Sequence, residues 1–233
     1  MLEARELTKA YRSHVALSQL NLCILPGEVF CLLGANGAGK STTIKLFLNF
    51  ISPTSGEVKI NGLNPRAHPA QTRSWLGYIP EQVSLYPRLS GIENLRYFAS
   101  LAGESNLHRQ RLSDALKQAG LPESAIDRRA ADYSKGMRQK VVIALALVRR
   151  VKGLLLDEPT SGLDPQAAHE FSRVLRQLSD EGVAILMASH DLYQVRQLAS
   201  RIGIMRQGVL VETFQSMDVS HLELEQRALQ LMK

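Results

Sequence analysis

Short apolar runs alternate with turn residues through the first third of the chain. Each run is a few residues long and is bounded by glycine, proline or charged residues, a pattern typical of strands. A helical spacing of apolar positions begins at Lys40. This part is therefore predicted to hold three or four strands and one helix, with the strands near residues 2–7, 20–25, 29–33 and 56–62.

The middle third has a helical rather than a strand-like spacing. After a short predicted strand at Leu76 to Ile79, apolar residues recur every three or four positions from Ile92 to about Leu121, with two glycines as terminators. Another helix is predicted from about Lys135 to Arg150. The pattern indicates a helical insert over approximately residues 90–150.

Strands and helices alternate in the last third. A buried strand at Gly153 to Leu156 is followed by an amphipathic helix at Gln166 to Leu178, and strands at 183–188 and 201–205 enclose another helix. Such alternation predicts an α/β fold with a mostly parallel sheet, which binds ligands at the carboxyl ends of its strands. The residues after Glu212 predict a short closing helix.

A glycine-rich loop joins the strand that ends at Leu33 to the helix that begins at Lys40. Residues 34–41 read GANGAGKS and fit the pattern G-x-x-x-x-G-K-S. Glycines let backbone N–H groups turn inward, and a helix start favours an anion, so a polyphosphate is the natural ligand. Lys40 is expected to reach the β and γ phosphates, and Ser41 to bind Mg²⁺. A flexible glycine-rich turn is the simpler alternative.

Length and cysteine content narrow the class of protein. At 233 residues the chain can form one large domain, or a domain with a subdomain, without a metal or disulfide. Cys23 and Cys31 are predicted to be small buried residues of a reduced, intracellular protein. The N-terminus carries no secretion signal, and the longest apolar run, Val141 to Val148, falls short of the roughly 20 residues of a membrane helix. We expect a chain that is soluble by itself.

The formal net charge of +6 has two interpretations. The pairs Arg128-Arg129 and Arg149-Arg150 would suit an anionic membrane surface or a nucleic acid. Solvated charges together with a phosphate site explain the same composition. Because the sequence has no dense block of lysine and arginine, no nucleic-acid partner is expected.

Two adjacent acids, Asp157 and Glu158, end the apolar strand near residue 155. Consecutive strand residues point to opposite sides, so the two carboxylates are expected to differ in role. Asp157 is placed to hold Mg²⁺, directly or through a water. Glu158 is then a candidate general base that polarises a water for in-line attack on the γ phosphate. An ordinary strand end that enters a turn at Pro159 is the alternative.

Each of two further positions can be interpreted either as structural or as functional. His190 ends the predicted strand at 183–188, at the edge where the phosphate site is expected, although a histidine there is commonly structural. Ser134 is a candidate N-cap of the helix that begins near Lys135, and this helix start is also suited to a phosphate.

The order of these features resembles the ATP-binding cassette (ABC) ATPase family. Residues 34–41, 134–137, 154–158 and 161–164, together with His190, are similar to its Walker A, signature, Walker B, D-loop and H-switch, and the match covers about residues 2–212. The resemblance implies a single domain over residues 1–233. Its expected fold is a P-loop NTPase core of the α/β class with a mostly parallel sheet, a small antiparallel β subdomain at the N-terminus and a helical subdomain inserted at approximately 90–150.

The resemblance also implies roles for single residues. Tyr11 would stack on adenine, Asp157 would serve magnesium together with Ser41, Glu158 would be the catalytic base, and His190 would contact the γ phosphate. Ser134 and Gly136 would belong to the ATP site of a partner, because cassettes of this family pair head to tail. The phosphate-binding set would be Gly34, Asn36, Gly37, Gly39, Lys40, Ser41 and Thr42.

Two segments depart from the family pattern. The Q-loop glutamine, which touches magnesium and the permease in the family, aligns with Glu81, and the neighbouring Gln82 is the other candidate for nucleotide and metal contact. The signature reads YSKGM, with Lys135 and Met137 where the family more often has glycine and glutamine. Both variants are similar to those in ATPase subunits of ABC-2 exporters.

The expected function is therefore that of an ATP-hydrolysing subunit that binds ATP and Mg²⁺ and drives a separate membrane permease in export. It is expected to dimerise with a second cassette, as a homodimer. Such a chain would be cytoplasmic and peripheral on the inner face of the cell membrane. A soluble ABC ATPase of cofactor or complex assembly is the alternative. A nucleotide kinase or GTPase explains neither the signature nor His190, and the guanine-specifying Asn-Lys-x-Asp is absent.

Overall fold

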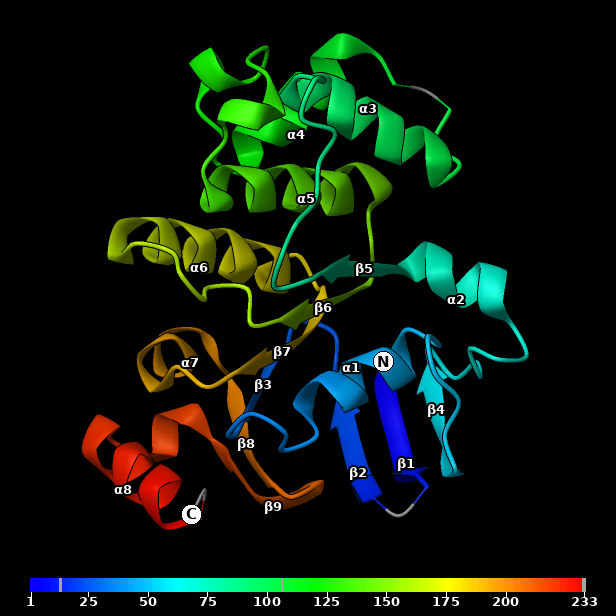
Figure 1. The fold of residues 1–233 in the computed structure, drawn as a ribbon, viewed down its shortest axis with the longest axis vertical. Helices are drawn as coiled ribbons and strands as arrows, with labels where there is room; N and C mark the ends of the chain where they lie inside the picture. Colours follow the sequence, from blue (N-terminus) through cyan, green and yellow to red (C-terminus); the bar gives the residue numbers. More distant parts are fainter. Residues whose placement is uncertain (13, 106, 232–233) are drawn as a thin grey trace.

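The computed structural model describes residues 1–12, 14–105 and 107–231 and contains two sheets (Figure 1). The smaller sheet is antiparallel, with the order β2-β1-β4, and lies at the lower right of the view. Its strands are β1 (Leu2–Tyr11), β2 (His14–Ile24) and β4 (Ser55–Ile60).

The larger sheet has the order β5-β6-β7-β3-β8-β9, and all its neighbouring strands are parallel except the pair β8 and β9. Parallel strands covered on both faces are apolar along their whole length, and β3 and β7 are buried at every position. The strands are β3 (Val29–Leu33), β5 (Leu76–Ile79), β6 (Gly153–Asp157), β7 (Ala184–Ser189), β8 (Arg201–Arg206) and β9 (Val209–Gln215).

Helices cover both faces of the large sheet and form a separate upper region (Figure 1). The α-helices are α1 (Lys40–Phe47), α2 (Pro69–Trp75), α3 (Gly91–Leu101), α4 (Arg109–Gln118), α5 (Lys135–Arg149), α6 (Pro165–Asp180), α7 (Leu192–Leu198) and α8 (His221–Leu231). Short 3-10 turns occupy Glu123–Ala125, Ala130–Asp132 and Ser216–Asp218.

The upper helical region is inserted between the neighbouring parallel strands β5 and β6. Its helix α3 begins with a capping box, in which Ser90 accepts from the Glu93 backbone and Glu93 accepts from that of Ser90. Its last helix, α5, packs on β5 and leads into β6. The guanidinium of Arg149, at the end of α5, donates to the carbonyl oxygens of Leu76 and Arg73 at 3.0 and 2.8 Å. The insert is thus an enlarged crossover connection.

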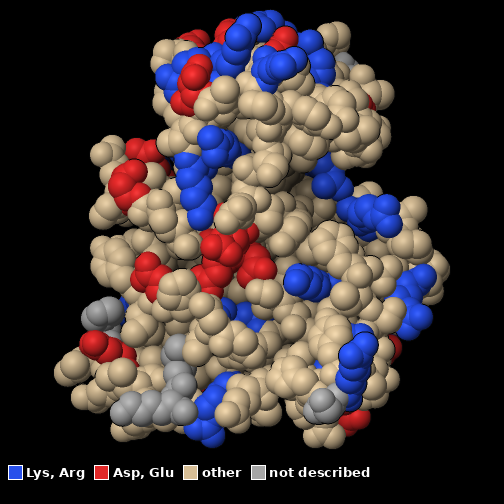
Figure 2. Space-filling model, viewed as in Figure 1, with Lys and Arg blue, Asp and Glu red and all other residues tan. Residues whose placement is uncertain are grey.

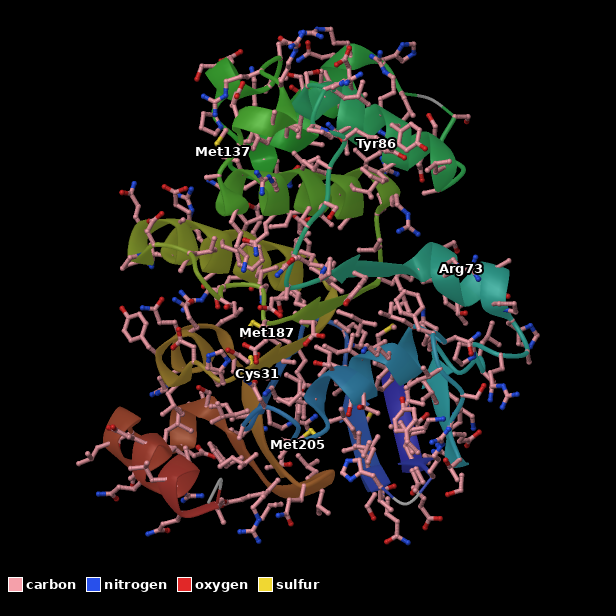
Figure 3. All side chains as sticks on the ribbon, in the orientation of Figure 1. Cys31, Arg73, Tyr86, Met137, Met187 and Met205 are labelled. Atoms are coloured by element: carbon pink, nitrogen blue, oxygen red, sulfur yellow. The ribbon has the colours of Figure 1, made fainter. Side chains whose placement is uncertain are left out.

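Two apolar clusters pack on opposite faces of the large sheet. The alternation along β3 shows this division, because Cys31 lies in the cluster with the helical region, whereas Leu32 lies in the cluster with α1 and the small sheet. Burial raises the pKa of the Cys31 thiol well above its usual value. Figure 3 shows Cys31 and Met187 together in the centre of the sheet.

The predicted α/β class, the mostly parallel sheet and the small antiparallel sheet are confirmed. The strand predicted at 20–25 begins earlier, at His14, and α2 and β9 were not predicted. The prediction of a buried Cys23 is wrong: this residue is exposed, because β2 alternates and buries Leu22 and Ile24 instead. Every helix in the described part of the chain is too short or too polar to span a lipid bilayer.

Candidate active site

The register of the parallel strands brings the predicted motifs to one edge of the large sheet. Leu33 at the end of β3 pairs with Ser189 at the end of β7, and Asp157 at the end of β6 pairs with Ala188. The glycine-rich loop, the two acids and His190 therefore all follow strand ends at the carboxyl edge, where α/β sheets bind their ligands.

Tight backbone packing fixes the glycine-rich loop from behind. Gly39, the N-cap of α1, has φ +104°, and a Cβ there would lie 2.7 Å from the carbonyl oxygen of Ala16 in β2 and 3.3 Å from Cα of Gly208. A Cβ on Gly34 would lie 2.5 Å from the carbonyl oxygen of Met205. Met205 marks this position below α1 in Figure 3. The loop therefore rests on both the β1–β2 hairpin and the β8–β9 turn.

The front of the loop faces solvent. Asn36 and Gly37 are exposed, and Thr42, in the first turn of α1, is half-buried. Residues 35–38 and 205–207 line a hollow of about 130 Å³. Gly37 has φ +83° and nothing lies within 4 Å of a Cβ built on it, so its requirement for glycine comes from the backbone conformation.

The ammonium of Lys40 is buried beside the loop. Its Nζ donates to the carbonyl oxygens of Gly34 and Ala35 at 2.6 and 3.2 Å and lies 3.4 Å from Oε1 of Glu158. The side chain is only 6% exposed. A positive charge held on loop carbonyls is placed to meet a phosphate that enters the loop.

Ser41 and Asp157 meet across α1 and β6. The Ser41 hydroxyl donates to Oδ1 of Asp157 at 2.8 Å. Burial raises the pKa of the Asp157 carboxyl, the hydrogen bond from Ser41 opposes this, and the nearby Glu158 adds to it. Neighbouring oxygen ligands of an octahedral Mg²⁺, each at about 2.0–2.1 Å, are about 2.9 Å apart, so this oxygen pair suits that ion.

Glu158 contacts different groups from its neighbour Asp157. Its Oε2 lies 2.9 Å from Nδ1 of His190 and accepts from the His190 backbone at 3.3 Å. Its Oε1 is buried and has no hydrogen-bond partner among the described residues, although the Lys40 ammonium is near. Glu158 also has φ +46°, a left-handed conformation, and its backbone N–H donates to Ala188 at 3.0 Å. The strand ending thus turns this carboxylate toward the loop.

The predicted adenine and Q-loop residues lie at the periphery of this cluster. Tyr11 ends β1, pairs with His14, and is 45% exposed. The Lys9 ammonium lies 4.8 Å from the centre of the Tyr11 ring. Glu81 and Gln82 follow β5 and are both exposed.

The signature residues lie in another part of the molecule. Ser134 caps α5 by accepting from the Met137 backbone at 3.3 Å, as predicted, and Gly136 is buried in the first turn. In Figure 3, Met137 lies at the left end of α5, above α6, whereas Met205 marks the glycine-rich loop below. One chain therefore does not bring Ser134 and Gly136 onto its own loop.

Two features of the site were not predicted from the sequence. Gly208 donates to the Ala38 carbonyl at 3.0 Å and accepts from Ser18 at 2.8 Å, so it joins the loop to β2. Its signal was the glycine itself, because a glycine between two apolar runs, here at 202–205 and 209–211, indicates a turn. The second feature is that Lys135 donates to the carbonyl of Ser161, a long-range contact that has no local signal.

Charges are mixed on the face that Figure 2 shows. Acidic side chains gather near the middle, below the helical region, while lysines and arginines spread over the top and the right side. This distribution differs from the continuous basic stripe that is typical of a nucleic-acid interface.

Comparison with known proteins gives a consistent family. The family described as ABC transporter matches residues 17–161. The linearmycin resistance ATP-binding protein LnrL of Bacillus subtilis is 33% identical over 212 residues, which cover 91% of this chain and 68% of that protein. The bacitracin transport ATP-binding protein BcrA of Enterococcus faecalis is 37% identical over 213 residues, with coverage of 91% and 68%.

Solved structures agree with this family. The structure of an ATP binding subunit of an ABC transporter has a TM-score of 0.87 and 31% identity, with complete coverage of both chains. The dimeric structure of MJ0796, a bacterial ABC transporter cassette, has a TM-score of 0.82 and 27% identity, and covers 93% of this chain and 99% of that one. The same cassette bound to ADP and Pi has a TM-score of 0.81. The resemblance found in the sequence is therefore confirmed, and the chain belongs to the ABC transporter family as an ATP-binding, ATP-hydrolysing subunit.

Proposed function

We propose that this subunit binds ATP and Mg²⁺ at the carboxyl edge of its large sheet, closes with a second copy around the nucleotide, and powers a separate membrane permease in export. The observation that carries the proposal is the cluster of Lys40, Glu158 and His190 beside the glycine-rich loop, with the signature residues turned away on α5. In this proposal the chain is one domain over residues 1–233, with a helical subdomain inserted at approximately 90–150.

The phosphates are proposed to contact the loop and the first turn of α1. Lys40 exchanges its contacts with the Gly34 and Ala35 carbonyls for the β and γ phosphates, and α1 contributes the partial positive charge of its first turn. Tyr11 stacks on the adenine, with Lys9 near its ring. The remaining phosphate contacts in this proposal are Asn36, Gly37, Gly39 and Thr42.

Ser41 and Asp157 are the proposed magnesium ligands, because their oxygens already lie 2.8 Å apart. The described residues contain no group of three or more His, Cys, Asp or Glu able to hold a metal alone, so phosphate oxygens and waters complete the shell, as is common for this ion. Bound magnesium neutralises phosphate charge. Gln82 and Glu81 are the candidates for a further contact.

Hydrolysis requires a base near the γ phosphate. Glu158 is the proposed base: its unpartnered, buried Oε1 accepts a hydrogen bond from the attacking water, while Oε2 stays on His190. A positioned base contributes about 10²–10⁴ in rate. His190, whose side chain is 55% exposed, reaches from β7 toward the γ phosphate.

The other half of each site is proposed to come from a second copy. Ser134 and Gly136 at the start of α5 then face the partner's nucleotide, which explains their distance from the loop of their own chain. A homodimer is the simplest assembly, and the relative MJ0796 is dimeric.

The proposal that the subunit works in export depends on the functions for which its relatives are named. Those named for linearmycin resistance, bacitracin transport and Nod factor export are ATP-binding proteins of about 33–37% identity. A chain of this kind would work at the cytoplasmic face of a membrane through a permease on another chain. The alternative, an ATPase of cofactor or complex assembly, has less support from these relatives.

Two measurements test the proposal. The purified chain should release phosphate from ATP only when Mg²⁺ is present, and affinity purification from detergent-solubilised membranes should recover a multi-span membrane protein with it. Recovery of a soluble scaffold protein instead would favour the assembly role. Absence of Mg²⁺-dependent ATP hydrolysis, both alone and with that membrane protein, would refute the proposal.

A further inference from the structure

The first turns of α5 are tied to the segment that follows Glu158 in the same chain. The Lys135 ammonium, which is partly buried, donates to the backbone carbonyl of Ser161. One turn further along α5, Gln139 is completely buried and its Nε2 donates to the carbonyl of Pro159. Because residues four apart lie on one face of a helix, the two side chains hold two carbonyls of the same short segment.

Packing between the same elements supports these hydrogen bonds. A Cβ built on Gly136 would lie 3.6 Å both from Leu163 and from Ala167, so the side of this residue where a Cβ would stand packs against the end of the segment and the start of α6. Lys140 forms an ion pair with Glu170 of α6 at 2.8 Å. The start of α5 is thus held against residues 159–170 along its length.

This segment is continuous with the proposed base. The Ser161 backbone N–H donates to the Glu158 carbonyl at 3.2 Å, and that of Leu163 donates to Thr160 at 3.1 Å. Lys135 therefore contacts the far end of a turn whose near end is Glu158. In the sequence, Lys135 stands directly between Ser134 and Gly136, which are proposed to face the partner's nucleotide.

A glycine at position 135 would have no side chain to reach Ser161. We propose that Lys135 is a positioning residue that couples the half-site offered to the partner, at the start of α5, to Glu158 in the chain's own site. This inference rests on the proposed function. When the partner's nucleotide engages Ser134 and Gly136, a shift of the start of α5 is transmitted through Lys135 to the turn that carries Glu158.

The coupling has a kinetic consequence. A displacement of about 1 Å at a reacting group can change a rate by about 10²-fold, whereas the affinity of the loop for phosphates depends on other residues. Loss of Lys135 should therefore lower kcat more than it raises KM. The two sites of a dimer should also respond less to one another, because the contact that links them is gone.

The test compares K135M, which keeps much of the apolar stem, with K135R, which keeps a donor able to reach a carbonyl. K117M is the matched control, since Lys117 forms a surface pair with Glu123 in the helical region and is 41% exposed. Two quantities are measured: the ATP dependence of phosphate release, and backbone hydrogen exchange of residues 160–164 in the nucleotide-free protein.

For K135M we expect about a tenfold lower kcat, a KM within about twofold of the original, a Hill coefficient closer to 1, and faster exchange at residues 160–164. K135R should restore most of each quantity, and K117M should leave all of them unchanged. A merely structural role would change exchange without altering the Hill coefficient or the balance of kcat and KM, and would overturn the proposal.

Other outcomes also separate the possibilities. If K135M loses activity without any change in exchange, the lysine acts on the partner's nucleotide directly and the coupling role is wrong. If K135M retains the original kinetics, the coupling role is wrong although the proposed function stands. If the unaltered protein does not hydrolyse ATP, the proposed function fails, and the coupling role fails with it because it has no site to act on.

Discussion

Nδ1 of His190 lies 2.9 Å from Oε2 of Glu158, so the ends of β7 and β6 are joined directly by two side chains. The other carboxylate oxygen lies 3.4 Å from the Lys40 ammonium. One carboxylate, only 13% exposed, thus stands between the loop lysine and the histidine. In the proposed function, the incoming phosphates take Lys40 from this arrangement, and Oε1 of Glu158 then accepts from the attacking water.

Replacing Glu158 with glutamine tests the base. E158Q keeps the size and shape of the side chain and one acceptor oxygen, but it removes the negative charge and the ability to accept a proton. We expect nearly unchanged ATP affinity, a fall in turnover of at least about 10²-fold, and a long-lived ATP-bound dimer. Phosphate release and size-exclusion chromatography with light scattering measure these effects. E225Q on α8, which alters an exposed glutamate, should behave like the original protein, and near-normal hydrolysis by E158Q would remove Glu158 as the base.

Lys40 is predicted to act in nucleotide binding itself. Charge-assisted hydrogen bonds contribute about 1.5–3 kcal/mol, so K40A should weaken ATP affinity by roughly 10- to 100-fold in calorimetric titration. The control is K45A, because Lys45 is an exposed lysine in the same helix. Equal affinities of K40A and the original protein would contradict the contact with phosphate.

Asp157 should make the stability of the nucleotide-free protein depend on pH. Because burial raises the pKa of this carboxyl, the folded chain binds a proton there more readily than the unfolded chain. Its contribution to stability is therefore full below the usual aspartate pKa and is lost as pH rises through the folded pKa.

D157N removes the ionised form, so at pH 7.5 and without nucleotide it should raise the unfolding temperature by about 2 °C. This gain should shrink when the pH is lowered, and the additional stabilisation by ATP with Mg²⁺ should be lost. Thermal unfolding with and without ATP and Mg²⁺ measures both effects. A variant that is less stable than the original protein at pH 7.5 would show that the Ser41 contact outweighs the burial of the charge.

Gly208 is predicted to be as intolerant of substitution as the glycines of the loop. It has φ +82°, and a Cβ there would lie 3.0 Å from the carbonyl carbon and oxygen of Ala16. G208A combines a left-handed conformation, at about 1–2 kcal/mol, with overpacking, at about 1–3 kcal/mol. We expect lower stability in urea unfolding and weaker ATP binding, because the loop rests on this turn.

The matched control for G208A is G182A. Gly182 has φ +92°, but nothing lies within 4 Å of a Cβ built there. This variant should show the conformational effect alone and should keep its ATP affinity. Equal losses of stability in the two variants would mean that packing against Ala16 contributes nothing.

The sequence predicted the elements whose signals are local. The strands β3, β6 and β7 are continuous apolar runs because both their faces are covered, and the glycine-rich loop is defined by eight consecutive residues. The strand β9 was missed because it lies at the sheet edge and only alternate residues are partly buried. The helix α2 was missed because it is short and buries only Thr72.

For the site, the rule that parallel strands carry ligands at their carboxyl ends was sufficient to group Lys40, Glu158 and His190. It could not give their contacts, because the 3.4 and 2.9 Å distances depend on the left-handed turn at Glu158. The contact of Lys135 with Ser161 joins positions 26 residues apart and depends on how α5 packs.

The enlarged crossover determines which part of the chain can be exchanged without changing the rest of the fold. Since α5 itself completes the connection from β5 to β6, residues 80–134 elaborate a single loop that precedes it. Arg149 anchors the far end of α5 to the strand where that loop starts. A chimera that exchanges only this stretch for that of a relative would keep the crossover helix, the sheet and the nucleotide loop, so one surface of the protein can be replaced while the ATPase core is retained.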